Sequence, residues 1–422
     1  MAERSAVVIG AGIGGLTAAL ALHLRGLRVT VLERAARLEP AGAGIALAPN
    51  AVKALDTLGL ADWLGGAAVI QGSGGVRRPD GTWLVRTEFG LVGERFGRPL
   101  LVVPRSELVD ALVARLPAGS LRLGSTVVGV EPGDAGAAAR PALVRTQQGG
   151  GTQNPGEEIA ADLVVAADGI RSAVRRALFP AHPGPRYAGF TAWRMITDVP
   201  DGVEISPSEA WGRGAVFGIV PLSHGRLYCY ATANLPADTA FPDEKAALAD
   251  RFAHWHEPIP TLIRQTPPES LLRNDIWELA EPLPRFHQGR VVLLGDAAHA
   301  MTPNLGQGGC QAVEDAVVLA HRVSGGGASG AVRPAGDVVD LADAVAAYTA
   351  DRLARTTRIV RQSARAGRMQ QSDSPLRATL RDAMITLAGM AGPGLMVRQM
   401  TPLASWTPPS SAGPATAMDS PR

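Results

Sequence analysis

The chain has 422 residues, of which 46% are hydrophobic and 19% charged, and its formal net charge is +2. This composition is typical of a soluble globular protein with room for two domains, and the small net charge gives no electrostatic footprint for nucleic acid. Two cysteines far apart in sequence form no local metal or redox motif, and no run of about 18 apolar residues predicts a membrane span. The N-terminus lacks the layout of a signal peptide, so we expect a cytoplasmic protein.

The first residues carry a glycine loop between two predicted strands. The expected elements are a strand at 6–9, the GAGIGG loop at 10–15, a helix at 16–25 and a strand at 29–32. Gly10 suits a tight turn, Gly12 the approach of a pyrophosphate, and Gly15 close packing of the helix. Glu33, at the end of the second strand, can accept hydrogen bonds from ribose hydroxyls. In this context the motif predicts a dinucleotide site.

A second glycine-rich loop follows at 42–50, and we expect Asn50 to cap the helix after it. Residues 73–100 are typical of a hairpin. Arg105 stands just before another predicted helix, where its guanidinium is either a phosphate partner or a surface charge. These segments by themselves do not name a ligand.

Two later segments again place an acid at the end of an apolar strand. In the first, Asp168-Gly169 precedes a short helix rich in arginine. In the second, Asp296 follows the strand at 291–294, and the glycines at 306–309 precede a helix. Ligands of open α/β sheets bind at the carboxyl ends of strands, and the unpaired N–H groups of a helix N-terminus favour an electron-rich group. A flat anionic ligand is therefore expected there.

Residues 187–286 differ in composition from the rest of the chain, because they hold 12 of the 19 aromatic residues. Strands are expected at 190–199, 215–222 and 226–233. Period-two alternation then sorts the faces of the last strand. Leu227, Cys229 and Ala231 should pack on a helix at 243–255, while Tyr228 and Tyr230 should face the other way.

The C-terminal part begins with a glycine-rich linker at 324–336, and a long helix is expected over 337–371. Arg358, Arg361, Arg365 and Arg368 form a basic stripe on that helix. Such a stripe can contact nucleic acid or lipid headgroups, but we expect a solvated face paired with carboxylates. From about residue 407 the tail has no apolar periodicity and is expected to be disordered.

Three motifs in this order resemble the single-component FAD-dependent aromatic hydroxylases of the para-hydroxybenzoate hydroxylase fold. They are GAGIGG with Glu33, the Asp168-Gly169 strand end, and GDAAHAMTPNLGQGG. The resemblance covers about residues 4–370, and the run PNLGQGGCQAVEDAVVLA is most similar to urate hydroxylases and zeaxanthin epoxidases. It implies an α/β fold with a Rossmann-like FAD-binding domain, a second, mostly β substrate domain and a long C-terminal helix.

The resemblance also implies domain boundaries. FAD-binding parts are expected at 1–72, 101–184 and 288–323, a substrate-domain hairpin at 73–100, the substrate-binding β-sheet domain at 185–287, a linker and C-terminal helices at 324–406, and a disordered tail at 407–422.

In that family the first glycine loop and Glu33 hold the ADP half of FAD, with Arg105 near the pyrophosphate and the Val127 backbone near the adenine. The loop at 42–46 would lie along the flavin. Asp296 would bind the ribityl chain, and the backbone at 306–310 would meet the pyrimidine edge of the flavin. The Asp168 strand end is associated with both FAD and NAD(P)H. The full implied set is Gly10, Gly12, Ile13, Gly14, Gly15, Glu33, Arg34, Ala46, Arg105, Val127, Asp168, Asp296, Gly306, Gln307, Gly308, Gly309 and Cys310.

For the substrate, the same alignment matches Tyr228 to a tyrosine of the urate pocket. The asparagine and arginine that hold urate fall on Ala192 and Ala215, so urate is not the expected substrate. By strand parity Arg194 shares a face with the first alanine, and Arg213 and Phe217 share one with the second. The expected pocket of Tyr228, Arg194, Phe217 and Arg213 indicates a larger or more apolar substrate than urate.

The implied activity is that of an FAD-dependent monooxygenase. NADH or NADPH reduces FAD, O2 adds to give a flavin hydroperoxide, and one oxygen atom hydroxylates or epoxidises an aromatic or polycyclic small molecule. The cofactor carries this chemistry, so no catalytic acid-base pair and no metal are required. A disulfide reductase would need a cysteine pair and a second glycine fingerprint, which the sequence lacks. A flavin-linked dehydrogenase or oxidase without oxygen insertion, and a dinucleotide sensor, remain alternatives.

Overall fold

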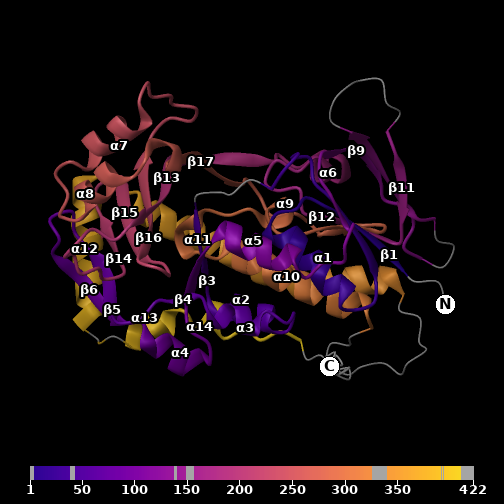
Figure 1. Cartoon of the computed structure of the whole chain (residues 1–422), viewed down its shortest axis with the longest axis horizontal. Helices are drawn as coiled ribbons and strands as arrows, with labels where there is room; N and C mark the ends of the chain where they lie inside the picture. The colour runs from indigo at the N-terminus through magenta and orange to yellow at the C-terminus, as the bar shows by residue number, and fades with distance from the viewer. Residues whose placement is uncertain are drawn as a thin grey trace.

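The computed structural model describes residues 4–38, 43–136, 140–148, 156–325, 340–390, 392 and 394–409. Most of the predicted linker and tail lies outside these residues. Two large sheets lie at opposite ends of the molecule, and long helices run between them (Figure 1).

The first sheet has six strands in the order β18-β19-β12-β1-β2-β8. Their bounds are β18 His287–Gln288, β19 Val291–Leu293, β12 Leu163–Ala166, β1 Ser5–Ile9, β2 Arg28–Leu32 and β8 Leu121–Arg122. β1 pairs in parallel with β2 and β12, and β12 pairs in parallel with β19. Parallel neighbours end at the same edge, so the residues after β1, β12 and β19 meet there.

The buried sides of the neighbouring helices form the main core with this sheet. α1 (Ile13–His23) and α10 (Gly308–Val323) pack against each other. The others nearby are α2 Pro49–Asp56, α3 Ala61–Gly65, α5 Arg105–Val113, α6 Ala173–Leu178 and α9 Asp296–His299. Two three-stranded sheets flank them, β3-β7-β4 (Gly44–Leu47, Leu101–Pro104, Ala68–Val69) and β11-β10-β9 (Glu158–Ala161, Ala142–Gln148, Ser125–Glu131).

The second large sheet has seven strands in the order β17-β13-β16-β15-β14-β5-β6. Their bounds are β17 Leu272–Leu279, β13 Pro185–Asp198, β16 Arg226–Asn234, β15 Ala215–Pro221, β14 Ser208–Trp211, β5 Ser73–Arg77 and β6 Trp83–Glu88. β5 and β6 come from the predicted hairpin and join this sheet although they precede it by some hundred residues. The rest of that segment forms α4 (Gly90–Phe96) instead of strand.

One face of this sheet packs on α7 (Glu244–Phe252) and α8 (Ile259–Gln265). Leu227, Cys229 and Ala231 lie on that face, as the alternation predicts. Phe217 lies there too, opposite Ala231, so its placement in the substrate pocket is wrong. The reason is register, because antiparallel partners share a face and Phe217 pairs with a residue that faces the helices.

The C-terminal helices are α11 (Leu341–Gln370), α12 (Pro375–Met390), α13 (Gly394–Gln399) and α14 (Thr401–Ala404). α11 runs between the two sheets, and α12 packs on β6 (Figure 1). None of the described helices is long and apolar enough to cross a membrane.

Candidate cofactor and substrate site

The glycines of the first loop divide into two kinds. A Cβ on Gly10, whose φ is +101°, would lie 2.5 Å from the Ala167 carbonyl oxygen, and a Cβ on Gly15 would lie 2.0 Å from the Gly10 oxygen. Both are required by packing within the protein. A Cβ on Gly12 would meet no atom within 4 Å, although Gly12 stands at the start of α1. Gly12 therefore leaves open space in front of the helix N-terminus, where a phosphate group is favoured.

Glu33 ties the end of β2 to this loop. Its Oε2 accepts a hydrogen bond from the Ala11 N–H at 2.8 Å, and its Oε1 accepts one from the Ala35 N–H at 2.9 Å. Each carboxylate oxygen keeps a further lone pair, so the group can still accept from sugar hydroxyls. Arg34 beside it is exposed and Ile13 is buried in the core.

Asp168 and Asp296 both lie near a buried arginine, Arg175. Arg175 is 1% exposed and donates to the carbonyl oxygens of Ala297, at 3.0 Å, and Ile170. Burial lowers the pKa of this guanidinium, and the negative charges of both acids oppose that shift. Asp168 accepts from the Val174 N–H through Oδ2, whereas its Oδ1 is buried without a partner among the described residues. That unsatisfied acceptor suits a ligand hydroxyl or amide.

Asp296 is exposed to solvent, yet burial among protein atoms raises its pKa, against the charges of His299, Arg105 and Arg175. A carboxylate has both properties when it lies on the floor of a cleft open to water. Arg105 is exposed at the start of α5, so this predicted residue does stand near the acid.

The glycine turn before α10 is fixed by side chains of α2 and α10. Gly306 has a φ of +61°, which favours glycine, and Gln307 after it is 2% exposed. The Gln307 Oε1 accepts from Asn50 Nδ2 at 3.1 Å and from Gln311 Nε2 at 3.0 Å. Asn50 is therefore buried inside α2, which begins at Pro49, and its predicted role as a helix cap is wrong. Its amide is used to fix the turn.

The loop at 44–47 lies against this turn. A Cβ on Gly309 would lie 2.7 Å from Ile45 Cδ1, while a Cβ on Gly308 would lie 4.0 Å from its nearest neighbour, Met301 Cγ. The Cys310 thiol contacts the Ala46 carbonyl oxygen at 3.5 Å, and burial raises its pKa to about 12. The thiol is therefore neutral, and what this position offers a ligand is its backbone N–H. Val127 is half-buried on β9, away from this turn in the flanking sheet beside β2.

Tyr228 connects the second sheet to the same loop. A Cβ on Gly44 would lie 2.5 Å from its ring, so the ring packs directly on the β3 backbone. Burial raises the pKa of Tyr228, and the charge and hydrogen bonding of Arg194 oppose this. Arg194 also donates to Asn274 Oδ1 at 3.3 Å. This brings the predicted tyrosine and arginine together beside the loop expected to lie along the flavin.

Behind Tyr228 stands a polar group that sequence reasoning missed. The rings of Tyr228 and Tyr230 are 5.7 Å apart, and the Tyr230 hydroxyl donates to Glu209. Trp211 Nε1 donates to the other oxygen of Glu209 at 2.7 Å. The alternation placed Tyr230 on the right face, but no sequence signal joined it to Glu209 on a different strand.

The other two predicted pocket residues lie elsewhere. Phe217 is fully buried, with its ring 5.4 Å from that of Phe252 on α7. Arg213 is exposed in the turn between β14 and β15, where the alternation of a strand does not apply. On β15, Val216 lies on the same face of the sheet as Tyr228, because it pairs with Thr232 of β16.

A buried ionic cluster joins α10 to α11 beneath the glycine turn. Arg352 donates to Asp315 Oδ1 at 2.6 Å and to Glu314 Oε2 at 2.5 Å, and Arg355 also binds Glu314. His299 Nε2 contacts Asp315 Oδ2 at 2.6 Å. Burial would raise the pKa of Asp315, but the charges of His299 and Arg352 outweigh it and hold the pKa at about 2. Satisfied clusters of this kind fix the relative position of two helices.

A family model described as FAD binding domain matches residues 3–363 of this chain. The protein belongs to this FAD-binding family. Its residues fit the cofactor, because the open space at Gly12, the unpartnered Asp168 oxygen and the accessible Asp296 all lie at one sheet edge.

Characterised relatives of this flavoprotein are oxygenases. Aurachin C monooxygenase/isomerase of Stigmatella aurantiaca is 38% identical over 383 residues, which covers 90% of this chain and 93% of the relative. The FAD-dependent urate hydroxylase of Klebsiella pneumoniae is 35% identical over 327 residues, 74% of this chain and 80% of that one. The structure of Klebsiella pneumoniae HpxO with FAD and uric acid superposes with a TM-score of 0.82 and 28% identity, and covers 95% and 97% of the two chains. The relatives are FAD-dependent monooxygenases, and the predicted family and fold are confirmed.

Proposed function

We propose that this flavoprotein uses NADH or NADPH and O2 to hydroxylate or epoxidise an aromatic or polycyclic small molecule. The observation that carries the proposal is the contact of Tyr228 with the Gly44 backbone. Through this contact, the face of the second sheet that carries Tyr228 and Tyr230 lies against the loop at 44–47, which we expect to lie along the flavin. The names of the relatives, which include 3-amino-4-hydroxybenzoate 2-monooxygenase of Streptomyces cremeus at 36% identity, support an aromatic substrate.

Bound FAD, once reduced, supplies the activation of O2 and the transfer of one oxygen atom. The chain then has three tasks: to hold the cofactor, to aim the substrate and to stabilise charge. Glu33 and Asp296 accept sugar and ribityl hydroxyls at the two ends of the sheet edge. The unpaired N–H groups at the start of α10 stabilise negative charge on the edge of the flavin ring. The first turn of that helix contains no acidic residue that would oppose this effect.

Arg194 and Tyr228 orient the substrate in this proposal. The Tyr228 phenol stays protonated at neutral pH because burial raises its pKa, so its hydroxyl can donate to a carbonyl or phenolate oxygen. The guanidinium of Arg194 favours an anionic or strongly polar oxygen on the same molecule. The two groups together fit a ring that carries an oxygen function next to the carbon that reacts.

The test measures NAD(P)H oxidation, product and hydrogen peroxide together on a substrate found by screening aromatic compounds for stimulated NAD(P)H oxidation. Tyr228→Phe and Arg194→Ala should keep FAD but form less product per NAD(P)H and more peroxide, because a displacement of about 1 Å can cost roughly 100-fold. Arg213→Ala removes an exposed turn arginine and should leave coupling unchanged. Unchanged coupling in the first two variants would place the substrate elsewhere, and absence of labelled oxygen from 18O2 in the product would refute a monooxygenase.

A further inference from the structure

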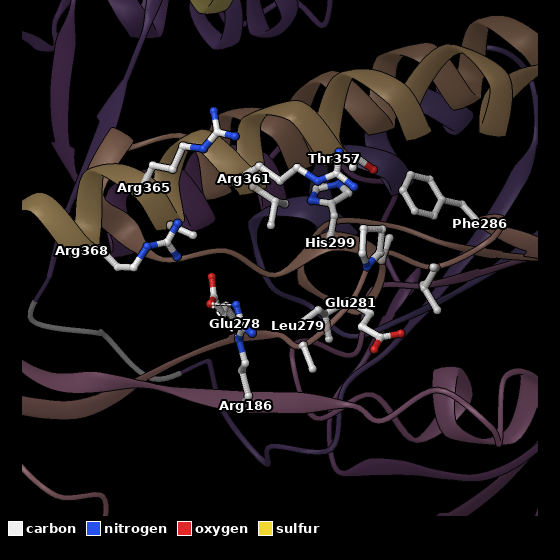
Figure 2. Close-up of a pocket in the computed structure, with 16 residues that line it drawn as sticks. Arg186, Glu278, Leu279, Glu281, Phe286, His299, Thr357, Arg361, Arg365 and Arg368 are labelled. Atoms are coloured by element: carbon white, nitrogen blue, oxygen red, sulfur yellow. Dashed lines mark hydrogen bonds and ion pairs between the residues drawn. The ribbon is translucent and has the colours of Figure 1, made fainter.

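A cavity of about 290 Å³ lies between α11, the end of β17 with the loop after it, and α9 (Figure 2). Arg361, Arg365 and Arg368 line it from α11, Glu278 lines it from β17, and His299 lines it from α9. Its volume is at the lower end of the roughly 300–1,000 Å³ of ligand pockets, so it suits a small ligand or one part of a larger one.

Among the described residues, and unlike Arg352 and Arg355 of the same helix, Arg361, Arg365 and Arg368 have no carboxylate partner. Their side chains are exposed, and within the described part of the chain no salt bridge joins any of them to an acid. The expectation that the basic stripe is paired with carboxylates is therefore wrong for these residues. With Arg186, the arginines outnumber the two glutamates of the lining, Glu278 and Glu281. The cavity is positively charged and open to an anion.

Two buried polar side chains of the lining are only half satisfied. Glu278 is 5% exposed, and both Arg186 Nε and Nη2 donate to its Oε1, at 3.0 and 2.7 Å, which leaves Oε2 without a partner among the described residues. His299 is also 5% exposed, and its Nδ1 is unpartnered in the same sense while Nε2 binds Asp315. Buried polar atoms rarely remain unpaired in native proteins, so both atoms point to a missing ligand.

We propose that this cavity binds a phosphate group that carries, or lies beside, a hydroxyl. Guanidinium groups bind phosphate oxygens through paired N–H donors. The free oxygen of Glu278 can only accept, so it requires a hydrogen-bond donor such as the P–OH of hydrogen phosphate or a sugar hydroxyl. Sulfate at neutral pH has no such proton and meets the carboxylate oxygen with repulsion.

The phosphate has two possible sources. Free inorganic phosphate is one, and the phosphate of the reduced nicotinamide nucleotide, with the ribose hydroxyl beside it, is the other. The second source rests on the proposed function, whereas the first does not. The experiment therefore has one arm for binding and one for the source.

In the binding arm, calorimetry on the FAD-loaded protein measures the Kd of inorganic phosphate and of sulfate. The double variant Arg361→Gln/Arg368→Gln should raise the phosphate Kd at least about tenfold, the effect of losing one charge-assisted hydrogen bond or more. Arg358→Gln is the matched control, because this exposed arginine of α11 does not line the cavity. Wild-type protein should prefer phosphate to sulfate, and Glu278→Gln should abolish that preference. Equal phosphate affinity in wild type and double variant would overturn the proposal.

In the source arm, steady-state oxidation of NADH and NADPH is followed in the same variants. If the nucleotide supplies the phosphate, the double variant raises the KM for the nucleotide about tenfold or more with FAD content and kcat retained, and inorganic phosphate competes. If free phosphate is the ligand, the KM is unchanged. A wild-type protein that oxidises neither nucleotide would refute the proposed function and leave the phosphate titration as the test of this site.

Discussion

The substitution Gly12→Ala should weaken FAD binding while the protein keeps its fold. A Cβ at this position meets no atom within 4 Å, and the φ of −72° is one that alanine adopts freely. As a residue at the start of a helix, alanine in place of glycine costs up to about 1 kcal/mol of stability. The apoprotein should therefore unfold at nearly the same urea concentration.

The cost falls on the cofactor instead. The new methyl group occupies the space in front of α1 that a pyrophosphate would use, and forcing a methyl into a close contact costs about 1–3 kcal/mol. The Kd for FAD should therefore rise between about fivefold and 150-fold. Quenching of flavin fluorescence on titration of the apoprotein measures this directly, and urea unfolding of the same samples measures stability.

Gly15→Ala is the matched comparison. Its Cβ would lie 2.0 Å from the Gly10 carbonyl oxygen, a separation that no packed structure tolerates. This variant should be destabilised before any cofactor is added, whereas Gly12→Ala should not. A Gly12→Ala protein with a wild-type Kd for FAD would refute the placement of the pyrophosphate, and one that fails to fold would refute the view that the loop is open there.

Four further outcomes are expected. Asp296→Ala should purify pale but folded, and a full flavin content at wild-type affinity would contradict the ribityl assignment. Arg352→Met should cost about 3–5 kcal/mol in urea unfolding because it leaves buried carboxylates unpaired, whereas Arg98→Met, at a surface pair, should cost at most about 1 kcal/mol. Asp315, with a folded pKa of about 2 against an unfolded value near 3.9, contributes roughly 2–3 kcal/mol that is present above pH 4 and lost as the pH falls toward 2; acid unfolding of Asp315→Asn should lack this loss. Urate should stimulate little oxygen consumption, since a pocket without the matching polar groups loses orders of magnitude.

The buried cluster around Asp315 connects the elements that form the cofactor site. Asp315 accepts from the Gly295 N–H at 3.0 Å as well as binding His299 and Arg352. The strand end that presents Asp296, the middle of α10 and the long helix α11 are therefore linked through one carboxylate. A change in this cluster should move the cofactor site as a unit, and FAD affinity should fall together with stability in Arg352→Met.

The sequence by itself determined the cofactor half of this protein. Glycine loops, buried strands and the acids that follow them are local patterns, and each reports a requirement of the backbone within a few residues. Parallel pairing then brings Gly12, Asp168 and Asp296 to one edge, which follows from strand polarity alone. The alternation of β16 likewise placed Tyr228 and Cys229 on opposite faces, because side chains of a strand alternate whatever its partners are.

Only the tertiary structure decided the substrate side and the roles of charged residues. The face of Phe217 depends on its register with β16, and Arg213 falls in a turn, so parity counted along the sequence failed for both. Arg175 and Arg176 look alike in the sequence, yet one is 1% exposed and the other lies at the surface. Asn50, Arg352 and Glu278 find their partners on elements far away in the chain. Contacts between distant elements decide where a polar side chain finds its hydrogen-bond partner, and the local sequence pattern does not indicate those contacts.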